Sequence, residues 1–115
     1  MKKHRQFFPV RPLAKERPRA TRTGHVYTPK RTAQYEKTIA ELYDGPMFPA
    51  DHTVEVSLIF TKEGTTLVVT AVKDPDWKPS LKGDVDNYVK SLLDALNGVA
   101  WEDDKQIIEV TARKL

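Results

Sequence analysis

Residues 83–104 read GDVDNYVKSLLDALNGVAWEDD, and the interpretation of the chain depends on this stretch. Its apolar residues recur at helical spacing, namely Val89, Leu92, Leu93 and Leu96. This pattern predicts a helix over about 87–96 with one buried stripe, ended by Asn97-Gly98. Six carboxylates and one lysine, Lys90, lie in the same stretch. The carboxylates belong to Asp84, Asp86, Asp94, Glu102, Asp103 and Asp104.

Length and composition are typical of one soluble domain. With 115 residues, a single domain over 1–115 is the natural expectation, and such a domain can bury enough surface to fold without disulfides or other cross-links. The chain has no cysteine, which excludes disulfides, thiolate metal sites and a cysteine nucleophile. The basic start, residues 1–6, is followed by no apolar leader, and no run approaches a membrane span. We therefore expect a cytoplasmic protein without a membrane role.

Charge is divided along the sequence. The basic N-terminal segment, residues 1–31, holds ten Lys and Arg against one acid, whereas residues 84–104 hold six acids against one lysine. A basic arm suits a polyanion, and an acidic cluster could hold a metal that acts on it. The alternative is a solvated basic tail and an acidic surface face.

Hydrophobic periodicity predicts the other elements. They are a short edge strand over 6–10, an exposed loop over 11–25, a helix from Thr28-Pro29 to about Tyr43, a hairpin of strands over 53–60 and 65–72, and a last strand over 106–113. Together they predict an α+β fold, a small mixed β-sheet packed against two main helices.

The acids of residues 84–104 have the chemistry of a magnesium site. Asp86, Lys90 and Asp94 are four residues apart and share one side of the predicted helix. Asp103 and Asp104 follow the turn at its other end, and they approach Asp84 and Asp86 only if the last strand runs back antiparallel beside the helix. Two or three carboxylates from two elements suffice for Mg²⁺, which prefers hard oxygen ligands.

Each member of the cluster also has an ordinary structural explanation. Asp84 or Asp86 could simply cap the helix, and Lys90 with Asp94 could be a surface ion pair. Asp103-Asp104 could be turn residues, with Trp101 a core anchor. The histidines show no ligand spacing. Only the joint pattern favours a metal site.

Three segments also resemble a known family. Residues 84–90 (DVDNYVK), 93–98 (LDALNG) and 101–107 (WEDDKQI) are similar to the D-x-D-N-x-x-K, D-A-L-N-G and W-x-D-D-x-Q signature of the RusA-type Holliday junction resolvases, common in phages and prophages. The segments 17–22 and 26–29 look like that family's N-terminal part.

The resemblance implies a Mg²⁺-dependent homodimeric endodeoxyribonuclease without a small-molecule cofactor. Such an enzyme resolves four-way DNA junctions by symmetric paired nicks in recombination and repair. By position, Asp84, Asp86 and Asp104 match the metal-binding acids and Lys90 the catalytic lysine, while Asp103, Asn87 and Asp94 have no fixed role. In the basic arm, we expect DNA contacts from Arg17, Arg19, Arg22, Lys30 and Arg31.

Two other functions share these residues. One is a nuclease of different specificity, for flaps, forks or RNA, and the other is a non-catalytic nucleic-acid-binding protein.

The chain also departs from the family in two places. Residues 62–73 look longer than in shorter relatives, and many relatives continue past Leu115 into a further strand.

Overall fold

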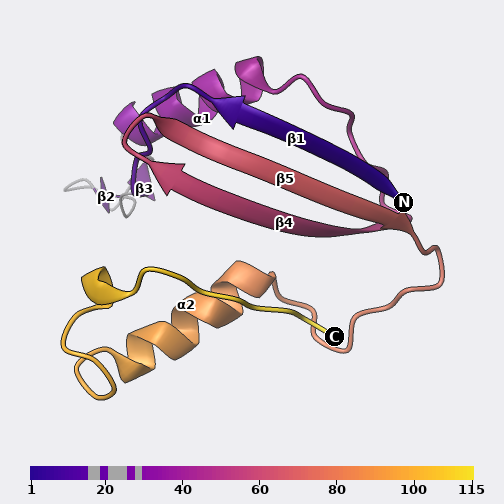
Figure 1. The fold of residues 1–115 in the computed structure, drawn as a ribbon. Helices are drawn as coiled ribbons and strands as arrows, with labels where there is room; N and C mark the ends of the chain where they lie inside the picture. The colour runs from indigo at the N-terminus through magenta and orange to yellow at the C-terminus, as the bar shows by residue number, and fades with distance from the viewer. Residues whose placement is uncertain (16–18, 21–25, 28–29) are drawn as a thin grey trace. The chain divides into compact units, whose positions relative to one another are not determined.

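The computed structural model of the chain describes residues 1–15, 19–20, 26–27 and 30–115 (Figure 1). The expected contacts of Arg17 and Arg22 and the helix start at Thr28-Pro29 lie outside these residues. The chain divides into two compact units, Met1–Asp76 and Trp77–Leu115, which we describe separately. The α+β class is confirmed, with two α-helices among the described elements, while the single domain stays a prediction. The described strands pair only antiparallel, so the sheet is not the mixed one expected.

The first unit is built on a three-stranded antiparallel sheet with the order β1-β5-β4. These strands are β1 (Lys2–Phe8), β5 (Gly64–Lys73) and β4 (His52–Thr61). The predicted hairpin is confirmed, with Thr61 opposite Gly64 at its turn. β1 is an edge strand as expected, although it begins at Lys2 and ends before Pro9, which has no N–H for a ladder.

A glycine allows β5 to begin beside β1. A Cβ added at Gly64 would lie 2.1 Å from the Phe8 carbonyl oxygen, so no side chain fits there.

Two shorter strands, β2 (Arg19–Ala20) and β3 (Val26–Tyr27), pair antiparallel with Arg19 opposite Tyr27. The predicted loop over 11–25 therefore contains a short strand that its proline-rich sequence did not indicate.

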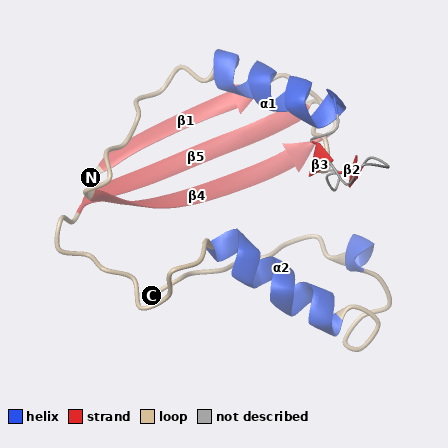
Figure 2. Ribbon diagram, turned by 180° about the vertical axis from the view of Figure 1, so that it is seen from behind, coloured by secondary structure: helices blue, strands red, loops and turns tan. Residues whose placement is uncertain are grey.

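The core lies on one face of the sheet. Phe8, Val69 and Ala71 are buried there, and the register places Val54 and Val56 of β4 on the same face. Helix α1 (Lys30–Leu42) lies near β1 on this side (Figure 2) and buries Thr32. The β4 side chains stay about half exposed, so the core is concentrated around β1 and β5.

Two side chains of β1 hold the end of α1. The Gln6 side-chain amide donates to the Leu42 carbonyl at 2.7 Å, and its oxygen accepts from the Asp44 N–H at 3.1 Å. The His4 Nε2 atom lies 3.2 Å from the Asp44 carboxylate. The helix ends at Leu42, close to the predicted end at about Tyr43, and a Cβ at Gly45 would lie 2.5 Å from the His4 ring.

The second unit contains α2 (Val85–Leu96) and the short 3₁₀ helix η1 (Asp104–Gln106). Gly98 follows the end of α2 with φ +80°, which confirms the predicted Asn97-Gly98 terminator. The last strand predicted over 106–113 is wrong, because residues 107–115 form no regular secondary structure. Alternating apolar residues need a neighbouring strand for a ladder, and here they run beside α2 instead (Figure 1).

Among the described residues, no helix combines the length and the apolar character that crossing a membrane requires.

Candidate functional site

Asp84 stands at the N-cap position of α2 without acting as a cap. Its side chain makes no capping hydrogen bond, and the Asp84 backbone carbonyl instead accepts from the N–H groups of Asn87 and Tyr88 at 3.1 and 3.3 Å. Asp86 is exposed in the first turn of the helix. The structure thus removes side-chain capping as the explanation for Asp84 and leaves both carboxylates facing solvent.

The backbone leading into Asp84 is fixed from two sides. The Gly83 N–H donates to the Tyr88 hydroxyl at 3.0 Å, and the Gly83 carbonyl accepts from Lys114 Nζ at 2.9 Å. A Cβ at Gly83 would lie 2.8 Å from the Tyr88 hydroxyl, so glycine permits this close approach. Neither Tyr88 nor Lys114 was predicted as a site residue from the sequence, since the contact of Lys114 with Gly83 depends on how residues 107–115 run beside α2.

Lys90 and Asp94 lie further along α2. Both side chains are exposed, and in the described part of the chain no ion pair joins them. The surface pair considered for them is therefore not formed. Lys90 follows Asp86 by four residues, which places the two on one side of the helix.

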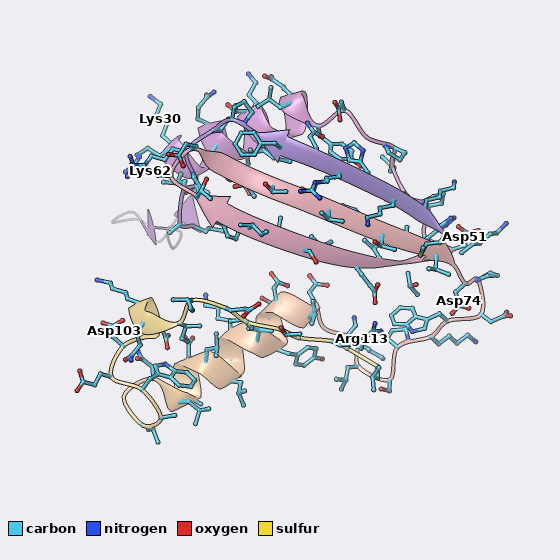
Figure 3. The ribbon with its side chains drawn as sticks, in the orientation of Figure 1. Lys30, Asp51, Lys62, Asp74, Asp103 and Arg113 are labelled. Atoms are coloured by element: carbon cyan, nitrogen blue, oxygen red, sulfur yellow. The ribbon has the colours of Figure 1, made fainter. Side chains whose placement is uncertain are left out.

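The acids after the turn have two different roles. Asp103 caps η1, since its carboxylate accepts from the Lys105 N–H at 2.9 Å and its own N–H donates to the Gln106 side chain at 3.0 Å. The half-buried Asp104 accepts instead from the Trp101 indole N–H at 2.6 Å. Asp103, labelled in Figure 3, is thus a capping residue, whereas Asp104 is held in place by a tryptophan.

The described residues contain no group of three or more His, Asp or Glu side chains close enough to hold a metal ion. The convergence expected for Asp84, Asp86 and Asp104 is therefore not found. A 12-residue helix is about 18 Å long, and the Asn97–Trp101 bridge places the η1 region near its far end. The returning segment brings residues 110–114, not Asp104, back along α2.

The donor chemistry nevertheless fits magnesium. Mg²⁺ is commonly held by one or two carboxylates together with waters and substrate phosphate oxygens. Asp84 and Asp86 supply two such carboxylates at a helix start, and neither is engaged by a hydrogen bond or ion pair among the described residues. These two members of the predicted set lie two positions apart at the same end of α2.

Of the predicted DNA contacts, only Lys30 and Arg31 have described side chains. Both are exposed at the start of α1, where they line a groove together with Arg11, and Lys30 is labelled in Figure 3. Arg19 lies in β2, where only the backbone is described, and the remaining two predicted arginines fall outside the described residues.

The comparisons with known proteins agree with the sequence motifs. A family model described as "Endodeoxyribonuclease RusA" matches residues 9–115. The chain is also 46% identical over 37 residues to the uncharacterized protein YqaN of Bacillus subtilis (strain 168). That match covers 32% of this chain and 26% of the relative. No solved structure matches.

Proposed function

This chain belongs to the endodeoxyribonuclease RusA family, and we propose that it is a Mg²⁺-dependent endodeoxyribonuclease that resolves four-way DNA junctions by symmetric paired nicks. We also propose that it acts in the cytoplasm in DNA recombination and repair. Besides the family match, one observation carries the proposal: Asp84 stands at the start of α2 but leaves its carboxylate free of capping. A carboxylate that serves only the helix would make that hydrogen bond.

Asp84, Asp86 and Asp104 are proposed as the metal-binding acids. Mg²⁺, when bound, would lower the pKa of a water and offset charge on the scissile phosphate. Asp84 and Asp86 hold their oxygens at one helix end, and the Trp101 indole fixes the orientation of Asp104. Bringing Asp104 to the other two acids requires an arrangement that differs from the one described above, and a divalent cation would favour it by offsetting the repulsion among the carboxylates.

Lys90 is the proposed catalytic lysine. Its ammonium stands one turn beyond Asp86, and no carboxylate pairs with it among the described residues. In that position it would stabilise negative charge that develops on phosphate oxygens during attack. Arg17, Arg19, Arg22, Lys30 and Arg31 are proposed to contact DNA phosphates, which makes binding strongly salt-dependent.

We propose that the protein acts as a homodimer. A two-fold dimer would place two sites for paired cuts in a junction that has a matching two-fold axis. Leu92 on α2 is 62% exposed and Phe60 on β4 is 60% exposed, so each unit has apolar area that a second copy could cover.

Substrate choice tests the proposal against its nearest rival. Radiolabelled four-way junctions should be cut in Mg²⁺ much faster than a flap, a fork, a linear duplex or an RNA of equal length. If a flap or RNA is cut as fast as the junction, the protein is a nuclease of other specificity. If none of these substrates is cut in Mg²⁺, the protein is a non-catalytic nucleic-acid-binding protein.

A further inference from the structure

A groove of about 600 Å³ runs between residues 10–13 and α1 in the first unit. This volume lies within the range of about 300–1,000 Å³ that small-molecule sites occupy. Its lining on the helix comes from one face, because positions 31, 34, 35 and 38 are three or four residues apart. Nothing proposed above uses the floor of this groove.

The floor of the groove is apolar and its rim is cationic. Val10, Pro12, Leu13 and the Tyr35 ring are half-buried, so they form a floor that is only partly open to water. Three exposed cations stand around them, namely Arg11, Lys30 and Arg31. The lining contains no acid, and the nearby Glu36 carboxylate lies 3.8 Å from Lys15 Nζ. The groove therefore suits a ligand with a flat uncharged part and an anionic part.

The groove also offers polar groups that could read a flat ligand. The Gln34 side-chain nitrogen lies 3.4 Å from the Thr38 hydroxyl, which in turn donates to the Gln34 carbonyl at 2.9 Å. The Gln34 amide nitrogen is thereby engaged with another lining residue, and the amide oxygen makes no hydrogen bond within the described residues. An amide can pair with the edge of a nucleobase.

We propose that this groove binds one unpaired nucleotide of a DNA strand. The base stacks on Tyr35 above the apolar floor, and its flanking phosphates contact the cations of the rim. Base stacking on an aromatic side chain is a common mode of single-strand recognition. The inference rests on the proposed function in taking DNA as the ligand, and it adds a selection step. Stacking is interrupted at a branch point, so a base there is extruded at lower cost than one inside a duplex.

Binding of a fluorescent single-stranded oligonucleotide in EDTA tests the proposal without any cutting. Tyr35→Ala should weaken single-strand binding about tenfold, whereas Tyr35→Phe should keep it, since a phenyl ring still stacks. Arg11→Ala should also weaken it. The matched control is Lys37→Ala, which removes one charge from α1 outside the groove lining and should change binding less than Arg11→Ala.

A site-specific signal keeps the test independent of affinity. An oligonucleotide with one 2-aminopurine should lose fluorescence on binding the wild-type protein and the Tyr35→Phe variant, but not the Tyr35→Ala variant. Circular dichroism establishes that each variant is folded, and Gln34→Ala, at an exposed position, replaces Tyr35→Ala if that variant is unfolded.

Two results would overturn the proposal. One is a set of folded groove variants that bind single strand as the wild type does. The other is equal binding of the mononucleotide dTMP and the oligonucleotide, which would indicate a free-nucleotide site. If the groove variants lose binding but no junction is cut, the proposed function fails and the groove assignment stands. If the junction is cut and the groove variants bind single strand as the wild type does, the proposed function stands and the groove assignment fails.

Discussion

Replacing Trp101 with Phe isolates the support that this residue gives to Asp104. In the wild type, the indole N–H donates to the Asp104 carboxylate at 2.6 Å, and both residues are half-buried. Phenylalanine keeps an aromatic ring at the position but has no donor. The change therefore removes one charge-assisted hydrogen bond from an acid that we assign to the metal.

The size of the effect follows from that bond. A hydrogen bond to a charged group contributes about 1.5–3 kcal/mol when buried, and water replaces part of it here because Asp104 is accessible. We expect the free energy of unfolding to fall by about 1 kcal/mol. Partners that orient a metal ligand typically change activity or metal affinity by about 10–100-fold, so junction cutting should slow by at least about tenfold.

The assay is junction cleavage across a range of Mg²⁺ concentrations. Trp101→Phe should raise the Mg²⁺ concentration needed for half-maximal rate. Trp77→Phe is the matched control for loss of an indole, and it should change the rate by less than about twofold, because a phenyl ring can still contact Lys114, whose Nζ lies 5.9 Å from the Trp77 ring centre. A Trp101→Phe protein that cuts at the wild-type rate with the same Mg²⁺ dependence would refute the role given to this bond.

Three further predictions follow from the same structure. Asp84→Asn should abolish cutting and change the free energy of unfolding by less than about 0.5 kcal/mol, whereas Asp103→Ala should lower that free energy by about 1 kcal/mol because it removes the η1 cap. Urea denaturation and a cleavage assay measure the two effects, and the reverse pattern would contradict the roles given to Asp84 and Asp103. Gly64→Ala should destabilise the sheet by more than about 3 kcal/mol, because its Cβ meets the Phe8 carbonyl, and an unchanged melting temperature would show that β1 is not paired there. A hydrogen bond between the Asp51 carboxylate and the His52 Nδ1 atom, 2.7 Å apart, lowers the pKa of Asp51. The ionised carboxylate therefore stabilises the fold above the pKa of unfolded Asp, and this contribution is lost as the pH falls below about 4. Asp51→Asn should reduce the dependence of stability on pH in this range, and identical acid-denaturation profiles of variant and wild type would contradict the pairing.

The sheet shows how far sequence patterns reach. Alternation in residues 53–60 and 65–72 predicted the hairpin, because a side-chain period of two with a short polar turn leaves few other structures. The same alternation at Ile108, Val110 and Ala112 predicted a strand that did not form. A period describes which way side chains point, whereas a strand also needs a partner, and only the tertiary structure supplies one.

The acidic stretch shows a different limit. Asp84 and Asp103 are both good N-cap residues by type, and the sequence could not tell which one caps. Backbone geometry decides this, since Asp103 reaches the Lys105 N–H while Asp84 leaves capping to its carbonyl. Only a weak indication in the sequence suggested that Trp101 binds Asp104, namely an indole N–H donor three residues before a carboxylate. The predicted meeting of Asp104 with Asp84 depended on the path of the chain after residue 98, which no local pattern determines.

The most direct test of the metal site is cleavage of a labelled four-way junction by the wild type and Asp86→Asn, each in Mg²⁺ and in EDTA, with junction binding measured in parallel. We predict that the wild type cuts only in Mg²⁺. Asp86→Asn should lose at least about a hundredfold in cutting rate while binding the junction as well or more tightly, because one repulsive carboxylate is gone. An Asp86→Asn protein that cuts at the wild-type rate in Mg²⁺ would contradict the assignment.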